Sequence, residues 1–207
     1  SGLEFRRVLF RSSGSLKSLP ELARNGLLMV VFLLTAIIIS AHFSTYSYIE
    51  PFAKDISGFD GKFITLFLLI FGVAGVVASL LFSKFYKLIP NAFSVISIML
   101  ILCCLLLLNF IAKNEVLMLV LAFIWGLGIA GVNMSFQIKV LNLASNATDA
   151  AMAIFSAIYN IGIGAGALIG HQTIVYLGEQ NIGNVGSFFA ASGLIIFLFA
   201  VSKVKRI

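Results

Sequence analysis

The chain has 207 residues, of which 60% are hydrophobic and 11% are charged, whereas soluble domains average about 45–50% apolar and about 25% charged residues. So few charges cannot cover the surface of a soluble domain of this size, so the composition excludes a water-soluble fold and predicts an all-α integral membrane protein. The net charge of +6 comes from basic residues that stand singly between apolar runs. Because they form no basic patch, we expect no nucleic-acid partner.

The N-terminal segment carries three arginines in the run LEFRRVLFRS. This run resembles the translation of a sequencing-library adapter, so we expect residues 1–12 to be a sequencing or fusion artefact. An ordinary basic leader is the alternative. A signal peptide is not expected, because no apolar core with a cleavage site follows the arginines directly. Residues 13–25 then precede the first membrane span.

Six apolar runs are long enough to cross a bilayer core, which needs about 20 residues of helix. A count of five spans would merge the third and fourth into one hairpin, but the sequence Lys113-Asn114-Glu115 separates them. Pro51 is expected to end the first helix. We therefore predict a six-helix transmembrane domain over residues 26–207, with spans at 26–48, 63–85, 92–112, 116–138, 150–176 and 185–201.

The basic residues of the loops predict the orientation, because Lys and Arg concentrate on the cytoplasmic side. Without the suspected artefact, eight fall on one side and three on the other. This distribution places both termini in the cytoplasm. The first group is Lys17, Arg24, Lys84, Lys87, Lys139, Lys203, Lys205 and Arg206, and the second is Lys54, Lys62 and Lys113.

The fifth span contains Gly162, Gly166 and Gly170 at intervals of four residues. Small residues at this spacing let a neighbouring helix backbone approach closely in lipid. We expect these three glycines to serve helix packing.

Polar residues inside three spans form one stripe each. Thr35, His42 and Tyr46 lie within about 40° of one another on the first helix, at about 100° per residue. Polar groups in a membrane are costly and usually face a cavity or another helix. Turned inward, the stripes would enclose an uncharged cavity that suits a neutral polyhydroxylated solute. The other two stripes are Asn133 with Gln137, and Ser156 with Asn160, Gly164 and His171.

Each of these residues also has a structural interpretation. Asn160 is equally well explained by a hydrogen bond to a neighbouring helix. His42 and His171 titrate near physiological pH, so either is a candidate for proton coupling, although an interhelical hydrogen bond is the simpler role. Glu50 is expected to be a solvated charge at a helix end.

Catalytic chemistry is not expected. The run Gly126-Leu-Gly128-Ile-Ala-Gly131 fits a dinucleotide-binding pattern, but that pattern requires a preceding strand and a soluble βαβ unit. Cys103 and Cys104 are adjacent in an apolar run and suit neither a disulfide framework nor a metal site. We therefore expect no enzyme activity, no cofactor and no metal.

Two stretches resemble a known family. The run AHFSTYSYIEPF at 41–52 resembles the seventh transmembrane helix of bacterial sugar efflux permeases of the major facilitator superfamily, in its drug:proton antiporter branch. The segment from Gln137 through Asp149, continued by the run from Ala153 to Ala167, is similar to the tenth-to-eleventh helix region of that family.

The resemblance implies that the six spans are helices 7 to 12, the C-terminal half of a twelve-helix major facilitator fold. Residues 13–25 would be the end of the central cytoplasmic loop, and the partner would be the missing N-terminal six-helix half. The family's gating motif after helix 8 is incomplete here, because Ser83-Lys84-Phe85-Tyr86-Lys87 keeps two basic residues but lacks its Asp and Gly.

We therefore expect a fragment of a secondary active transporter in the bacterial cytoplasmic (inner) membrane, which exports a sugar or a related small neutral solute by alternating access with proton coupling. His42 is the proton-coupling candidate. The alternatives are a multidrug efflux permease of the same superfamily and a non-transporting membrane scaffold subunit. The expected substrate-binding residues are His42, Tyr46, Asn133, Gln137, Ser156 and Asn160.

Overall fold

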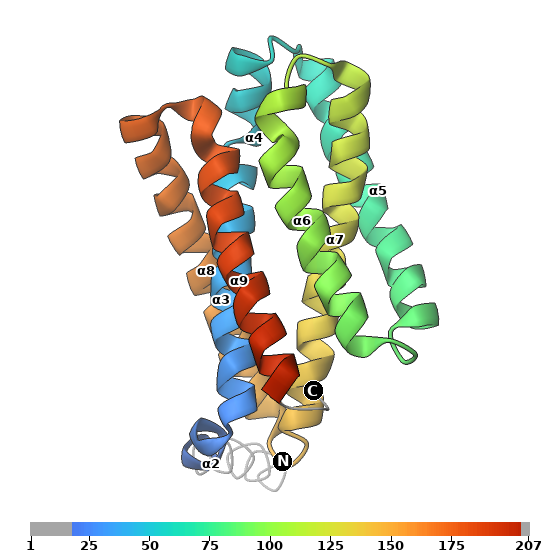
Figure 1. Cartoon of the computed structure of the whole chain (residues 1–207), viewed down its shortest axis with the longest axis vertical. Coiled ribbons are helices and arrows are strands. Elements are labelled where there is room, and N and C mark those ends of the chain that lie inside the picture. Colours follow the sequence, from blue (N-terminus) through green and yellow to red (C-terminus); the bar gives the residue numbers. More distant parts are fainter. Residues whose placement is uncertain (1–17, 204–207) are drawn as a thin grey trace, which may run out of the picture.

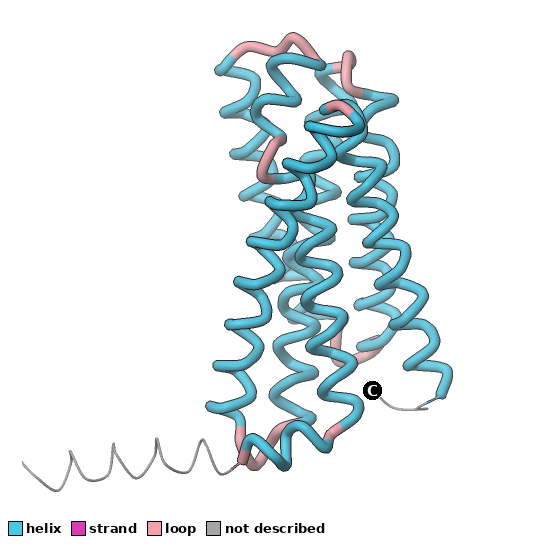
Figure 2. The backbone as a smooth tube through the Cα atoms, turned by 90° about the vertical axis from the view of Figure 1, so that its left-hand side faces the viewer, coloured by secondary structure: helices cyan, strands magenta, loops and turns pink. Residues whose placement is uncertain are grey.

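The computed structural model describes residues 18–203 as helices joined by short turns, without a strand in that range (Figures 1 and 2). The expectations for residues 1–12 and 13–17 lie outside the described part. Six helices are long and apolar enough to cross a membrane, which confirms the predicted number of spans. The helices are α2 (Leu19–Arg24), α3 (Gly26–Tyr46), α4 (Ile49–Pro51), η1 (Phe52–Ile56), α5 (Gly61–Phe85), α6 (Pro90–Ile111), α7 (Glu115–Leu143), α8 (Thr148–Leu177), η2 (Glu179–Asn181) and α9 (Ile182–Lys203).

Three of the long helices begin at a capping side chain that the sequence supplies. Asn25, Asp60 and Asn114 accept hydrogen bonds from the third backbone N–H of α3, α5 and α7, at 3.1, 2.9 and 3.0 Å. Each bond satisfies an N–H that has no partner within its helix. Asn25 also donates to the carbonyl oxygen of Leu143, at 2.9 Å, and so ties the start of α3 to the end of α7.

The prediction that Pro51 ends the first helix is wrong. Helix α3 ends at Tyr46, where Tyr48 donates to the carbonyl of Thr45 and closes a tighter turn. Pro51 lies within the short helix α4 that follows. It is tolerated there because the first N–H groups of a helix need no partner within it.

The fourth span is longer than predicted, and this changes the position of Lys139. Helix α7 continues to Leu143, so Lys139 is part of the helix and not of a loop. Its side chain is only 3% exposed. The ammonium donates to Asn91 Oδ1 at 2.8 Å and lies 5.5 Å from the centre of the Phe197 ring. A long aliphatic stem can pack among apolar neighbours while the charged end keeps polar contacts, and this explains how a lysine is accommodated there.

The six long helices form two related groups of three. Helix α3 packs against α8 and α9, and α7 packs against α5 and α6, while α6 and α9 join the groups. Exchanging α3 with α7, α5 with α8 and α6 with α9 reproduces these pairings. Because α3 and α7 run in opposite directions, the two groups are inverted relative to each other (Figure 1).

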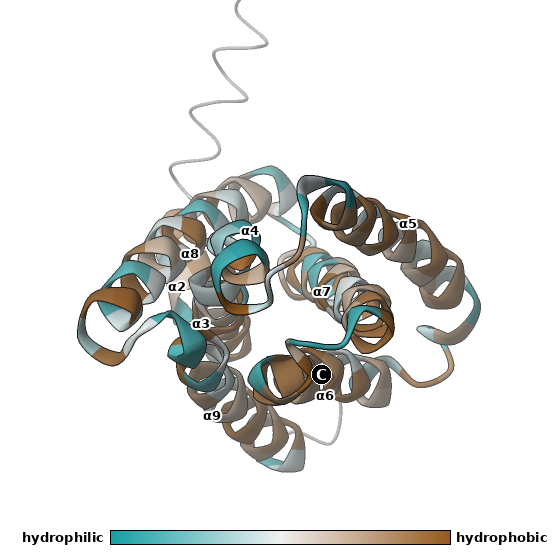
Figure 3. Ribbon diagram, turned by 90° about the horizontal axis from the view of Figure 1, so that it is seen from above, coloured by the Kyte–Doolittle hydropathy of each residue, from teal (hydrophilic) through white to brown (hydrophobic). Residues whose placement is uncertain are grey.

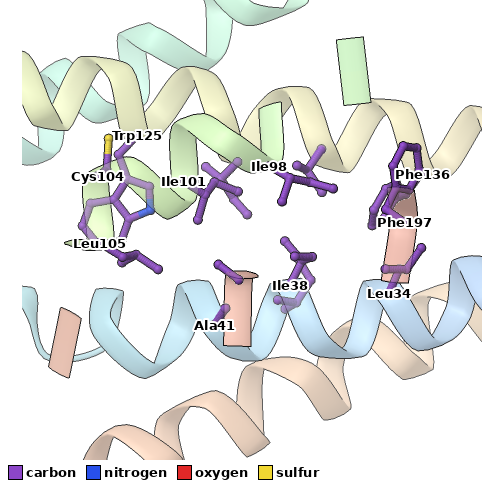
Figure 4. Close-up of a cluster of buried hydrophobic side chains, with 14 of the residues drawn as sticks. Leu34, Ile38, Ala41, Ile98, Ile101, Cys104, Leu105, Trp125, Phe136 and Phe197 are labelled. Carbon is purple, nitrogen blue, oxygen red and sulfur yellow. The ribbon is translucent and has the colours of Figure 1, made fainter. Parts of the chain in front are cut away.

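The core lies where these groups meet. In Figure 4, Ile38 and Ala41 of α3 face Ile98 and Ile101 of α6, and all four side chains are fully buried. Much of the outward surface is apolar instead of charged, above all on α5 (Figure 3), where Leu69 is 63% and Leu80 is 65% exposed. This distribution is the one expected of a bundle surrounded by lipid.

Basic residues mark the two ends of the bundle. Arg24, Lys87 and Lys203 lie at the end that holds α2 and the end of α9, and Lys54 and Lys113 lie at the opposite end (Figure 1). The helices therefore sort the basic residues to opposite ends as the sequence predicts. Which end faces the cytoplasm stays a prediction.

Candidate functional site

A pocket of about 250 Å³ lies between α7 and α8. It contains four of the six residues that the sequence proposes for substrate binding, and it adds two aromatic residues that the sequence reasoning missed. No charged side chain lines it. Its lining residues are Asn133 and Gln137 of α7 and Phe155, Ser156, Tyr159 and Asn160 of α8.

The lining residues carry three amide groups and two hydroxyl groups. Gln137 Nε2 donates to Asn133 Oδ1 at 3.1 Å, and Asn160 Nδ2 donates to the carbonyl of Ser156 at 2.8 Å. Each amide side chain offers two N–H donors and one oxygen acceptor. These two bonds therefore use only part of the hydrogen-bonding capacity of the three amides, and the rest is available to a ligand or water.

The polar stripe of α8 is exposed. Ser156, Asn160, Gly164 and His171 all lie on the exposed surface, and α8 has the lowest mean hydropathy and the least buried span of the six helices. Helix α5 is nearly as exposed but strongly apolar. A polar face on a membrane-spanning helix requires contact with water or protein. The α8 surface therefore differs from a lipid-facing surface.

His42 and Tyr46 do not line this pocket. His42 is 3% exposed and lies among aromatic rings of α3, α5 and α7, with ring-centre distances of 4.9 Å to Tyr46, 6.0 Å to Phe71 and 5.4 Å to Trp125. Trp125 is eight residues before Asn133, which corresponds to about 12 Å along α7. We call His42, Phe43, Tyr46, Phe71 and Trp125 the aromatic cluster.

The aromatic cluster contains two polar atoms that lack partners. His42 Nδ1 and Trp125 Nε1 are buried and have no hydrogen-bond partner among the described residues. Buried polar atoms are nearly always paired, so such a pair of atoms in one cluster is unusual. Thr35, on the same edge of α3, instead donates to the carbonyl of Val31 within its own helix. The predicted stripe on α3 is thus split between different environments.

The three glycines of α8 face α3 and do not line the pocket. A Cβ atom at Gly162 would lie 3.0 Å from Ile39, and one at Gly166 would lie 2.7 Å from the carbonyl oxygen of Ser40. At Gly170 a Cβ atom would collide with the carbonyl oxygen of Ser44. The backbones of α3 and α8 therefore approach along this row of glycines, and this contact fixes the side of α8 that carries Ser156 and Asn160.

The glycines that fit the dinucleotide-binding pattern lie inside α7, where they also form close helix contacts. A Cβ atom at Gly126 would lie 2.5 Å from the carbonyl oxygen of Phe71, and one at Gly128 would lie 3.0 Å from the carbonyl oxygen of Ser97. No strand precedes them in the described chain, so the requirements of a dinucleotide site are not met.

Potential metal ligands mostly lie apart from one another in the described residues. Within residues 18–203 no three His, Cys, Asp or Glu side chains come together in a way that could hold a metal. Cys103 is exposed and Cys104 is buried, and both are free thiols.

Comparison with known proteins supplies the family. The Major Facilitator Superfamily profile matches residues 4–167. A probable sugar efflux transporter of Haemophilus influenzae is 48% identical over 95% of this chain and 50% of its own length. Those of Pasteurella multocida and Mannheimia succiniciproducens are 48% and 46% identical, over 93% and 97% of this chain and 48% and 51% of their own lengths.

The chain therefore spans about half the length of the curated relatives it matches. Members of this superfamily are membrane transporters and not enzymes, in agreement with the six apolar spans and the uncharged pocket. The chain is a multi-pass membrane protein that belongs to the Major Facilitator Superfamily.

Proposed function

We propose that this chain is the C-terminal half of a transporter that exports a sugar or a related small neutral solute across the bacterial inner membrane. The names of its relatives support the substrate class, and their length supports a second half. The basic residues support a cytoplasmic position for both termini. Transport would proceed by alternating access, in which two six-helix halves rock around a site between them.

The observation that carries this proposal is the pocket between α7 and α8. Its polar groups are amide and hydroxyl groups, which can donate and accept hydrogen bonds without a counter-charge. A sugar requires many such bonds and no ion pair. The polar stripe of α8 is open on the surface of the chain, where the other half would cover it and complete the site.

His42 and Tyr46 are proposed to act from the aromatic cluster. The unpartnered His42 Nδ1 is the group that could hold a proton or a substrate hydroxyl during transport. Because the aromatic cluster lies about 12 Å from the α7–α8 pocket along the helix axis, a role in proton coupling fits its position better than direct contact with a small solute in the pocket.

The decisive experiment replaces Asn160 with alanine in the full-length transporter and measures sugar efflux from energised cells. Losing one hydrogen bond to the solute, worth about 1–1.5 kcal/mol, should lower transport about fivefold to tenfold. The matched control is Asn109→Ala, because Asn109 is an exposed amide on α6 away from the pocket. Equal efflux by Asn160→Ala and Asn109→Ala at equal protein levels would refute the assignment of the pocket.

Two further outcomes separate the alternatives. Phe155 and Tyr159 give the pocket an aromatic wall, which also suits amphipathic drugs. Competition of efflux by such drugs, and not by sugars, would favour a multidrug permease. In a scaffold subunit, partner helices would cover the polar stripe, so a cysteine at Asn133 or Asn160 would not react with aqueous reagents. The chain on its own should not transport, because half of the enclosing site is missing.

A further inference from the structure

A second and larger pocket, of about 600 Å³, lies at the end of the bundle where α5 ends and α6 begins. It is formed by the end of α5, the start of α6 and the last turns of α7. It shares no lining residue with the α7–α8 pocket. We call it the basic pocket, because the charged side chains that line it are Lys87 and Lys139.

The two lysines enter the basic pocket from different helices and different depths. Lys139 is 3% exposed, and Asn91 holds its ammonium at 2.8 Å from the amide oxygen. Lys87 is exposed in the turn after α5. Two basic side chains thus line one pocket, and this favours an occupant with an anionic group.

Tyr86 adds a neutral polar side chain to the same wall. Its hydroxyl donates to the carbonyl of Ser135 at 3.4 Å, and its ring lies 6.0 Å from the Lys139 ammonium. Burial raises the pKa of Tyr86 to about 12, so the phenol stays protonated at cellular pH and brings no negative charge.

The remaining walls are largely apolar, with Phe82, Pro90 and Ile138 among them. A fitting occupant therefore carries an anionic group for the lysines and an apolar part for these side chains. A phospholipid combines the two at this depth, where the ends of the helices meet the headgroup layer. Basic pockets between transmembrane helices are suited to anionic lipid headgroups.

We propose that the basic pocket binds the headgroup of an anionic phospholipid. The phosphodiester would lie between the ammonium groups of Lys87 and Lys139, with the side-chain amide of Asn142 at the rim. The first methylenes of the acyl chains would lie against Phe82 and Ile138. This site does not depend on which solute the transporter carries, since the α7–α8 pocket is separate from it.

The test is binding of phosphatidylglycerol to the purified chain in neutral detergent, followed by native mass spectrometry. Phosphatidylcholine with the same acyl chains is the neutral comparison. We expect phosphatidylglycerol to bind at least about tenfold more tightly, and Lys87→Gln to weaken it about fivefold, the effect typical of one basic side chain near an anionic lipid.

Lys84→Gln is the matched control. Lys84 is an exposed lysine one helical turn earlier, does not line the pocket and lies over the Phe85 ring. It should leave binding unchanged. Lys87→Gln is the main test variant, because Lys87 is exposed and its replacement should not disturb folding. Lys139→Gln should weaken binding further. It is compared only if its circular dichroism matches that of the unaltered chain.

Three results would overturn the proposal. Equal binding of the two lipids would indicate a general apolar groove. Binding of glycerol 1-phosphate as tight as that of phosphatidylglycerol would indicate a site for a soluble anion. Equal losses in Lys84→Gln and Lys87→Gln would indicate attraction by the whole basic end and not by this pocket.

Discussion

Gly166 of α8 offers a sharp test of how α3 and α8 pack against each other within their group of three helices. A Cβ atom there would lie 2.7 Å from the carbonyl oxygen of Ser40 and 2.8 Å from Phe43 Cβ on α3. Both distances are far shorter than van der Waals contact, and a backbone oxygen cannot turn aside. Gly164, two residues earlier on the same helix, has no atom within 4 Å of the same position. Alanine at Gly166 therefore forces α3 and α8 apart, and alanine at Gly164 does not.

The size of the effect follows from two opposing terms. Adding a methyl group to a tightly packed contact costs about 1–3 kcal/mol. Replacing glycine by alanine inside a helix stabilises it by about 1 kcal/mol, and this term is common to both positions. The difference between the variants therefore isolates the contact, and we expect Gly166→Ala to be about 1–3 kcal/mol less stable than Gly164→Ala.

The measurement is reversible unfolding of the chain in mixed detergent micelles, in which the fraction of dodecyl sulfate is raised and helix content is followed by circular dichroism. Both variants differ from the unaltered chain by one methyl group on the same helix, so each controls for the other. If Gly166→Ala unfolds at the same detergent composition as Gly164→Ala, α3 and α8 do not meet at this glycine and the packing scheme is wrong.

Substitutions at three further positions test the helix ends and the aromatic cluster. Asn25→Ala should lower the free energy of unfolding by about 0.5–2 kcal/mol in the same detergent titration, because α3 loses its cap. Asn25→Asp keeps the oxygen that accepts the capping hydrogen bond, so it should lower this free energy by less. Asp60→Ala should speed amide hydrogen exchange in the first turn of α5, while the first turn of α7, capped by Asn114, stays protected. Trp125→Phe should lower the free energy of unfolding by less than about 1.5 kcal/mol, because Nε1 has no hydrogen-bond partner to lose. Trp125→Ala should lower it by about 3–5 kcal/mol, because it leaves a cavity. Equal losses for the two variants in thermal unfolding would contradict full burial of the indole.

Much of the bundle can be predicted from the sequence because a bilayer imposes simple local rules. The number of spans follows from the length of apolar runs. The predicted starts at 26, 63 and 116 lie within two residues of the observed starts of α3, α5 and α7, where Asn25, Asp60 and Asn114 cap the helices. Helix ends without such signals are harder. The sequence predicts the end of α7 five residues too early, at 138 instead of Leu143. A lysine such as Lys139 is typical of a loop, and the sequence does not show that Asn91 accepts a hydrogen bond from it inside the bundle.

For the candidate site, too, the sequence predicts the local features but not how the helices are arranged. Sequence periodicity alone determines that Asn133 and Gln137 share one face of a helix and that Ser156 and Asn160 share another. It gives only the angle of each side chain around the axis of its own helix. It contains no information about which helices are neighbours or how each is rotated toward the next.

Tertiary structure decides those rotations. The close approach of α8 to α3 along Gly162, Gly166 and Gly170 fixes the side of α8 that meets α7, and so brings two of the three predicted polar stripes into one pocket. The same packing places His42 in the aromatic cluster instead. Composition and period thus establish a six-span bundle with polar stripes, and only the close contacts between helix backbones determine which stripes face one another, because those contacts depend on residues far apart in the chain.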